Sequence, residues 1–204
     1  MTPILYSFRR CPYAMRARLA LIAADQRVHL REIALRDKPA AFLAASPKAT
    51  VPVLVTDQGV IAESLQIMQW ALAQNDPEGW LQMPPEAAAW IARCDGSFKT
   101  ALDGVKYASR APDALPAHRA NAIAFLTDLN ASLGLWLYGK PSLADAALLP
   151  FVRQYAKIDP DWFAAQNWPR LQDWLARFLA SEAFARAMQK QPLWQPGAAP
   201  LAFP

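Results

Sequence analysis

The stretch ILYSFRRCPYAMRARLALIA, residues 4–23, decides the fold. Residues 4–8 form a short run of β-type side chains, and from residue 13 onward apolar side chains recur at helical spacing. Pro12 suits the first turn of a helix, because its ring fixes φ and its missing N–H would have no intrahelical partner there. The stretch therefore predicts a strand that leads directly into a helix, with Cys11 at the junction.

Cys11 stands at a place that changes the chemistry of a thiol. The first turn of a helix offers backbone N–H groups and the positive end of the helix dipole, and both favour an anion. Arg9, Arg10 and Arg16 add positive charge nearby, so we expect a thiolate that acts as a nucleophile. Ala14 replaces the second cysteine of a Cys-X-X-Cys pair, so a redox role needs an external thiol. The alternative is that Cys11 is a small buried apolar residue.

The segments that follow complete an α/β pattern. Residues 28–33 alternate apolar and polar side chains, residues 39–45 and 64–73 are helical, and the runs 53–55 and 60–62 flank a hairpin turn. The element order is therefore βαβαββα. Two βα units pair parallel strands and the hairpin adds antiparallel ones, which gives a mixed four-stranded sheet.

Helix breakers mark the end of this first half. They concentrate at residues 75–79 and again at residues 84–85, which indicates a linker. Beyond the linker, strand signals vanish and long segments show helical periodicity. We therefore predict an α/β domain at residues 1–75, a linker at 76–85 and an all-helical domain at 86–204.

Two features of the helical half are especially clear. Ser142-Leu143-Ala144-Asp145 places a hydroxyl N-cap three residues ahead of an acid, just before an apolar run. Such a box stabilises a helix by about 1 kcal/mol. The tail after Gln191 contains four prolines, so we expect it to run extended over the surface.

Composition limits the classes of function. Hydrophobic residues make up 54% and charged residues 19% of the chain, which is typical of a globular protein. The net charge of +4 forms no basic tail or stripe, so we expect no nucleic-acid partner. No apolar run approaches the roughly 20 residues of a membrane span, and the opening residues do not resemble a secretory signal. We therefore expect a cytoplasmic protein with no membrane partner.

The second cysteine and the two histidines indicate no further chemistry. Cys94 falls in the helical half, and we expect it to be a packing residue. Neither cysteine stands in a paired metal-ligand spacing with His29 or His118, so we expect no metal site. Two cysteines also give no disulfide framework.

Two further segments add groups that suit a peptide. Pro52 follows a loop at the start of a strand, so Val51-Pro52 is a candidate cis peptide bond that would offer the backbone of Val51 to an extended peptide. Glu63 and Ser64 precede the third helix, where Glu63 suits an ammonium group and the helix start suits a carboxylate. Those are the two ends of an amino-acid headgroup. The alternative for Ser64 is a plain helix N-cap.

The chain resembles the cytosolic glutathione S-transferases of the cysteine type and is nearest to their omega class. The resemblance rests on motifs that occur in order at residues 6–16, 38–39, 51–52 and 63–64, and the Ser142 box is similar too. It implies a thioredoxin-like first domain that holds glutathione and a helical second domain that supplies a pocket for an electrophile. It also implies a homodimer.

Carried over residue by residue, the resemblance implies how glutathione is held. Cys11 would contact or bond its sulfur, and Val51 would pair its backbone with the cysteinyl unit. Glu63 and Ser64 would hold the γ-glutamyl end, and Lys38 the glycyl carboxylate. Three aromatic residues, each more often core than pocket, would line the electrophile pocket: Tyr107, Trp162 and Phe163.

Three functions are compatible with the sequence. The first is a glutathione-dependent thioltransferase, in which Cys11 attacks a glutathionylated substrate, forms a mixed disulfide and is released by a second glutathione. The second is conjugation, in which Tyr6 or Ser7 stabilises the thiolate of glutathione for attack on a small electrophile. The third is a binding or interaction protein that kept the fold without the reaction. We favour the first, because Cys11 is the residue at the helix dipole.

Overall fold

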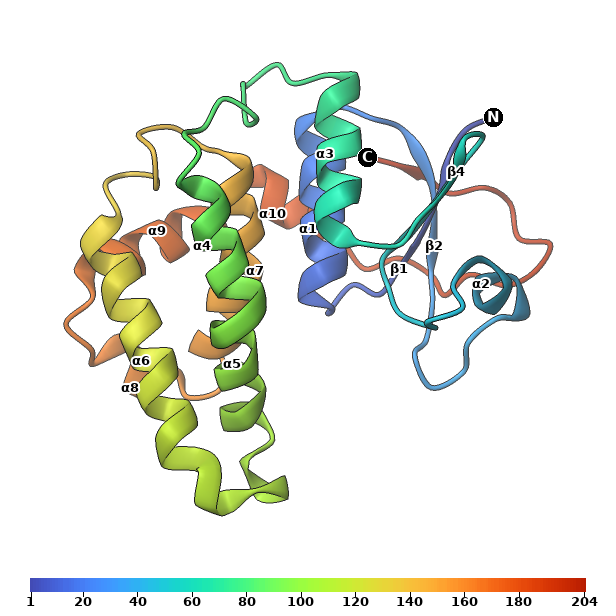
Figure 1. The fold of residues 1–204 in the computed structure, drawn as a ribbon. Coiled ribbons are helices and arrows are strands. Elements are labelled where there is room, and N and C mark those ends of the chain that lie inside the picture. Colours follow the sequence, from blue (N-terminus) through green and yellow to red (C-terminus); the bar gives the residue numbers. More distant parts are fainter. The chain divides into compact units, whose positions relative to one another are not determined.

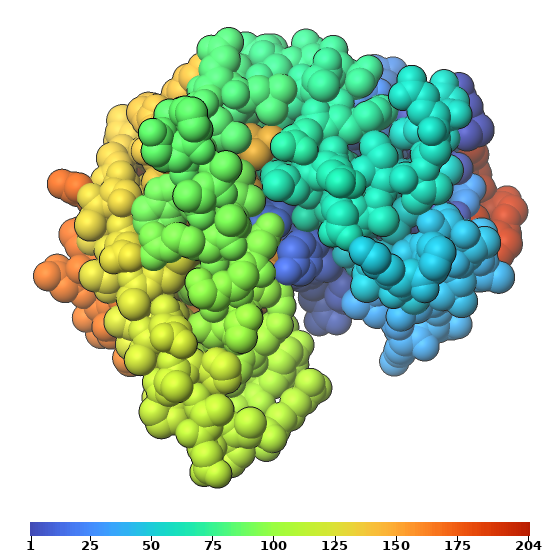
Figure 2. Space-filling model, in the orientation of Figure 1, coloured from blue at the N-terminus to red at the C-terminus, as the bar shows by residue number.

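The computed structural model describes residues 1–204. Packing separates the chain into two compact units: residues 1–81 together with 181–204 form the first, and residues 82–180 form the second. In Figure 2 the red C-terminal atoms lie beside the blue and cyan atoms of the first unit. The sequence pattern assigns residues 181–204 to the helical domain, whereas the structure groups them with the first unit. The domain limits drawn from the sequence otherwise stay a prediction.

The first unit is built on one mixed sheet with the strand order β4-β3-β1-β2-β5. β1 and β2 are parallel, and the other neighbours are antiparallel. The strands are β1 (Ile4–Ser7), β2 (Val28–Glu32), β3 (Val53–Thr56), β4 (Gly59–Ile61) and β5 (Ala202–Phe203). The first four confirm the predicted thioredoxin-like βαβαββα domain, and β5 is a fifth strand that the sequence pattern does not predict.

Helices cover both faces of this sheet (Figure 1). α1 (Pro12–Ala23) and α3 (Ser64–Gln74) pack against each other on one face, and α2 (Ala40–Ala45) lies on the other. α10 (Glu182–Ala187) packs against α1. Phe42 of α2 is fully buried in an apolar cluster with side chains of the sheet. The junction between β1 and α1 is therefore held between packed layers.

The C-terminal segment is tied along the edge of β2. The main-chain N–H of Trp194 donates to the Glu32 carbonyl at 2.7 Å, and that of Leu30 donates to the Leu201 carbonyl at 2.8 Å. The Arg31 guanidinium lies over the Trp194 ring, 4.2 Å from its centroid. β5 then pairs with the start of β2. The tail is extended, as the prolines predict, and it also covers a strand edge that could otherwise pair with another chain.

The second unit is helical, as the sequence predicts. Its helices are α4 (Ala87–Arg93), α5 (Lys99–Lys106), α6 (Leu115–Ser132), α7 (Leu143–Ala156), α8 (Pro160–Ala164) and α9 (Pro169–Leu179). A π-helical turn at Cys94–Phe98 joins α4 to α5, and 3-10 turns at Ala108–Arg110 and Pro112–Ala114 precede α6. The periodicity does not predict α8, because five residues are too few to show one. None of the helices has both the length and the apolar character needed to cross a membrane.

The predicted box at the start of α7 is confirmed. Ser142 caps the helix by accepting the main-chain N–H of Asp145 at 3.3 Å, and its hydroxyl donates to the Asp145 carboxylate at 2.5 Å. The buried carboxylate also accepts from the N–H of Leu137 at 3.0 Å and from the indole of Trp174 at 2.8 Å. Asp145 therefore joins the loop before α7 to α9.

Candidate active site around Cys11

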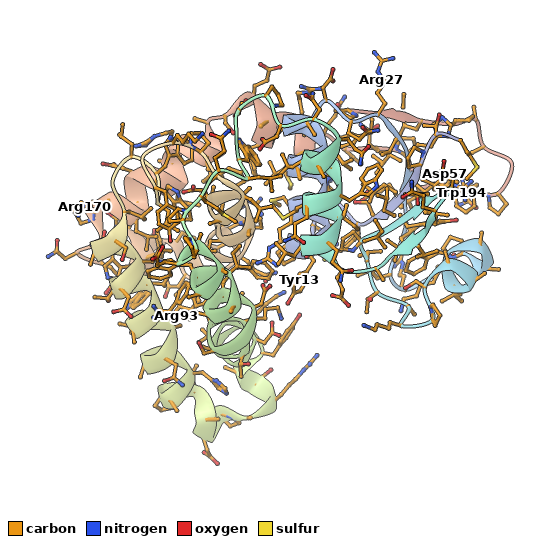
Figure 3. All side chains as sticks on the ribbon, turned by 45° about the horizontal axis from the view of Figure 1, so that its top comes forward. Tyr13, Arg27, Asp57, Arg93, Arg170 and Trp194 are labelled. Atoms are coloured by element: carbon orange, nitrogen blue, oxygen red, sulfur yellow. The ribbon has the colours of Figure 1, made fainter.

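Cys11 is the N-cap residue of α1. Its φ of −74° and ψ of 124° are extended, and Pro12 is the first helical residue. The Cys11 N–H donates to the Phe8 carbonyl, and the Cys11 carbonyl accepts from the Met15 N–H, both at 2.9 Å. Tyr13, labelled in Figure 3, marks this end of the helix. The half-buried thiol thus lies at the start of a 12-residue helix, whose dipole favours an anion.

The fold brings the segment at Val51 to Cys11, 40 residues away in the chain. The Cys11 thiol donates to the Val51 carbonyl at a sulfur–oxygen distance of 3.7 Å. The Val51–Pro52 bond is cis, as the sequence predicts. Val51 belongs to a buried apolar cluster that also contains Tyr6, and Cys11 packs at its border. One side of the site is therefore formed by the main chain at Val51.

The start of α3 supplies a charged group. Glu63 is the N-cap residue and Ser64 the first helical residue, so Ser64 does not serve as a plain N-cap. Ser64 is buried, whereas Glu63 is exposed and accepts from Lys48 Nζ at 2.9 Å. Glu63 therefore forms an exposed ion pair with Lys48, and its role in binding glutathione stays a prediction. Lys48 lies in the loop before β3, and no local pattern in the sequence identifies it as a neighbour.

Lys38 lies on a separate segment. It is half-buried in the connection between β2 and α2, one residue before the N-cap residue of α2. The structure thus brings Cys11 and Val51 into contact and places Glu63 and Ser64 at the start of α3, while Lys38 comes from the β2–α2 connection.

Tyr6 and Ser7, the residues that conjugation would use, are both occupied by other groups. The Tyr6 side chain is 3% exposed, and its hydroxyl accepts from Arg31 Nη1 at 2.5 Å. Ser7 is fully buried, and its hydroxyl accepts from Arg18 Nη1. Each hydroxyl therefore binds a guanidinium group, and the half-buried thiol of Cys11 is the more accessible nucleophile.

Three charged residues near the Cys11 turn are buried: Arg16 and Arg18 on α1, and Glu32 at the end of β2. Burial lowers the pKa of Arg18 to about 10, while Glu32 and the Cys11 thiolate act in the opposite sense. Burial also raises the pKa of Glu32, which a hydrogen bond from Arg9 opposes. Helical periodicity alone does not predict that Arg18 is buried. The alternation in β2 does predict that Glu32 is buried, because Glu32 shares a face of the strand with Leu30.

Two family models match the chain. The glutathione S-transferase N-terminal domain matches residues 5–80, and the glutathione S-transferase C-terminal domain matches residues 112–177. The chain belongs to the glutathione S-transferase family. Its fold agrees with that of a glutathione transferase family member from Pseudomonas fluorescens pf-5, whose crystal structure has two glutathione bound. The two structures align over 92% of each chain with a TM-score of 0.80 and 18% identity.

Curated glutathione S-transferases match this chain over shorter stretches. Glutathione S-transferase DHAR2 of Arabidopsis thaliana is 34% identical over 92 residues, which are 45% of this chain and 43% of that protein. Glutathione S-transferase omega-2 of Homo sapiens is 44% identical over 54 residues, which are 26% of this chain and 22% of that protein. The aligned stretch therefore spans less than half the length of either relative.

The aromatic residues expected to line the electrophile pocket of this transferase lie in different environments. Trp162 borders a cleft of about 60 Å³, which Tyr155 also lines. Phe163 is buried against the ring of Trp168, with ring centroids 5.8 Å apart, so it offers little surface to a ligand. Tyr107 is exposed beyond the end of α5 and is not among the residues that line this cleft. The electrophile pocket stays a prediction.

Proposed function

We propose that this glutathione S-transferase is a glutathione-dependent thioltransferase with Cys11 as its nucleophile. The observation that supports the proposal most is the environment of the thiol, which is half-buried at the start of α1 and contacts the Val51 carbonyl. The hydroxyls of Tyr6 and Ser7, in contrast, bind guanidinium groups. Similarity to DHAR2 and to an omega-class transferase adds support.

Glutathione would lie along the segments that the sequence identifies. Val51 would pair its main chain with the cysteinyl unit, and the start of α3 at Ser64 would bind the γ-glutamyl carboxylate. Glu63 would bind the ammonium group of glutathione in the manner in which it now binds Lys48. Lys38 would bind the glycyl carboxylate. The Pseudomonas family member with bound glutathione has the same fold, which supports glutathione as the ligand.

The reaction exchanges one disulfide for another. The Cys11 thiolate attacks the glutathionyl sulfur of a mixed disulfide, so that a bond forms between Cys11 and glutathione while the substrate leaves as a thiolate and takes up a proton. A second glutathione, as its thiolate, then attacks the sulfur of the adduct that comes from the first glutathione. Glutathione disulfide leaves, and Cys11 returns to the thiolate form. The net exchange converts the substrate mixed disulfide and one reduced glutathione into the free substrate thiol and glutathione disulfide.

Intact-mass spectrometry after incubation with glutathione disulfide tests the proposal. We expect a mass gain of one glutathionyl group, which reduced glutathione then removes. Cys11→Ser should show no gain. Cys94→Ser is the matched control, because Cys94 is the other cysteine and is fully buried, and it should show the same gain as the unmodified sequence.

The other two functions have their own outcomes in this experiment. If no adduct forms and conjugation of a model electrophile survives Cys11→Ser, the protein is a conjugating transferase and the proposal is wrong. If neither adduct nor conjugation is observed, a binding role replaces both. The homodimer and the cytoplasmic location stay predictions of the sequence.

A further inference from the structure

Two opposite charges are buried beside the turn that contains Cys11. Arg18, on α1, is 2% exposed, and Glu32, at the end of β2, is 7% exposed. Arg18 Nη1 lies 3.9 Å from Glu32 Oε2, at the outer limit of an ion pair. The two residues belong to different elements, so the fold rather than the local sequence creates the pair.

Both side chains hold the main chain of Arg9. The Arg9 N–H donates to Glu32 Oε1 at 2.5 Å, and the Arg9 carbonyl accepts from Arg18 Nη2 at 2.6 Å. Arg18 Nη1 also donates to the hydroxyl of Ser7, on the strand side of the turn. Cys11 follows Arg9 by two residues. The pair therefore fixes the turn from which the thiol projects.

Hydrogen bonding alone does not require charges at these positions. Neutral side chains could hold the Arg9 main chain, and a buried ion pair is often no more stable than well-packed neutral residues. A buried charge, however, acts on neighbouring ionisable groups through an interior that screens poorly. Cys11 is such a neighbour, because it follows by two residues the Arg9 main chain that both side chains hold, and its thiolate acts to raise the pKa of Arg18.

We propose that Arg18 and Glu32 are positioning residues that set the ionisation of Cys11 in opposite directions: Arg18 favours the thiolate and Glu32 opposes it. The proposal rests on the proposed role of Cys11 as the nucleophile. The pair holds the turn in one geometry, and its two charges have opposite effects on the sulfur, in addition to the positive charge of Arg16. Loss of either charge leaves the other unbalanced.

The remaining charged side chains on the surrounding elements of the first unit are unchanged in every variant used below. They include Arg9 and Arg10 in the turn, the fully buried Arg16 on α1, Arg31 on β2, Arg36, Asp37 and Lys38 before α2, Lys48 before β3, Glu63 at α3, and Glu182 and Arg186 on α10. A change that follows replacement of Arg18 or Glu32 therefore reports the loss of those two charges.

The rate of Cys11 alkylation by iodoacetamide, followed across pH in a Cys94→Ser background, gives the pKa of the thiol. Arg18→Met keeps the side-chain length without the charge, and we expect the thiol pKa to rise by about one unit. Glu32→Gln keeps an acceptor for the Arg9 N–H without the charge, and we expect the thiol pKa to fall by about half a unit. Arg18→Lys keeps the charge and should stay close to the parent protein.

Shifts of opposite sign distinguish an electrostatic role from a merely structural one, which would disturb the turn in the same direction in both variants. Shifts of the same sign, or no shift in either variant, overturn the proposal. If Arg18→Met fails to fold, Glu32→Gln decides alone: a fall in the thiol pKa supports the proposal, and a rise or no change overturns it.

Alkylation requires no glutathione, so this result is independent of the thioltransferase assignment. Opposite shifts of the thiol pKa in a protein that forms no glutathione adduct would support the opposite effects of Arg18 and Glu32 and would overturn the proposed function. An adduct on Cys11 together with thiol pKa shifts of the same sign in both variants would support the proposed function. It would overturn the proposal that Arg18 and Glu32 act in opposite directions.

Discussion

Each unit of the chain contains a buried acid, and the two acids are held differently. Asp145, in the helical unit, accepts from neutral donors, among them the N–H of Leu137 and the indole of Trp174. Glu32, in the thioredoxin-like unit, also accepts from a main-chain N–H, but it faces the Arg18 guanidinium at 3.9 Å. Burial raises the pKa of both carboxyl groups.

The comparison separates two uses of a buried polar group. The neutral donors around Asp145 join segments of the helical unit, so loss of the carboxylate leaves donors without an acceptor and lowers stability. The Arg18–Glu32 pair also joins segments, and we propose that its charges act beyond hydrogen-bond distance on the Cys11 thiol. Variants at Asp145 should therefore change stability alone, whereas variants at Arg18 and Glu32 should change both stability and the reactivity of the Cys11 thiol.

Replacement of Asp145 by alanine has the largest expected effect. Asp145→Ala leaves the Leu137 N–H and the Trp174 indole without their acceptor, and we expect the free energy of unfolding to fall by about 3 kcal/mol. Urea unfolding followed by tryptophan fluorescence measures the loss. The alkylation rate of Cys11 in the folded protein should not change. A changed rate would show that the Asp145 network acts on the thiol as well.

The Arg18–Glu32 pair should show energetic coupling in a double-mutant cycle. Arg18→Met and Glu32→Gln each lower the free energy of unfolding by about 2 kcal/mol, because each leaves a buried charge without its partner. The double variant should lose about 1 kcal/mol less than the sum, because neither charge of the pair is then left without the other. Urea unfolding of the four proteins completes the cycle, and additive losses would contradict an interaction between the two charges.

Asp145 also gives a pH dependence whose sign follows from its burial. Burial raises its folded-state pKa above the ordinary 3.8, so the folded protein binds this proton more tightly than the unfolded chain does. The resulting stabilisation is complete below pH values of about 4 and is lost as pH rises through the folded-state pKa. A tenfold difference in proton affinity between the folded and unfolded states corresponds to about 1.4 kcal/mol.

Asp145→Asn removes this titration and provides the measurement. The difference in the free energy of unfolding between the parent protein and Asp145→Asn should become less favourable to the parent as pH rises from about 4 towards neutrality. Urea unfolding at a series of pH values follows that difference. A difference that stays constant, or that grows in favour of the parent, would contradict a raised pKa.

The smallest effect is expected at a surface ion pair in the same helical unit. Arg93, labelled on α4 in Figure 3, donates to Asp128 at 2.6 Å, and the two side chains are 43% and 58% exposed. Asp128→Ala should lower the free energy of unfolding by less than about 1 kcal/mol, and less still at high salt. It is the matched control for Asp145→Ala. If Asp128→Ala and Asp145→Ala lower the free energy of unfolding equally, burial does not explain the contribution of Asp145.

Local patterns predict much of this fold. The alternation in β2, the helical spacing after Cys11 and the Ser142 box each depend on residues close together in the sequence, and the structure contains all three. The cis bond at Val51–Pro52 is also visible in the sequence, from a proline at the start of a strand. The prediction of Cys11 as a site residue likewise needs only the strand and helix on either side of it.

Features that the sequence does not reveal depend on residues far apart in the chain. β5 consists of two residues between Pro200 and Pro204, and its partner β2 lies near the other end of the chain, so no local pattern identifies it. Charged residues such as Arg18 are typical of the solvated face of a helix, and its burial depends on the turn at Arg9. The contacts that glutathione would make with Lys38, Ser64 and the other binding residues stay predictions.

The position of β5 also affects the order in which the protein is assembled during synthesis. β5 is translated only after the whole helical unit, whereas β1, α1 and β2 emerge from the ribosome early. The outer edge of β2 therefore stays open while the helical unit is made, and an open strand edge is a site at which nascent chains aggregate. A translation product that stops short of Trp194 would lack the main-chain hydrogen bonds of Trp194 and Leu201 to β2 as well as β5, and would leave the edge uncovered.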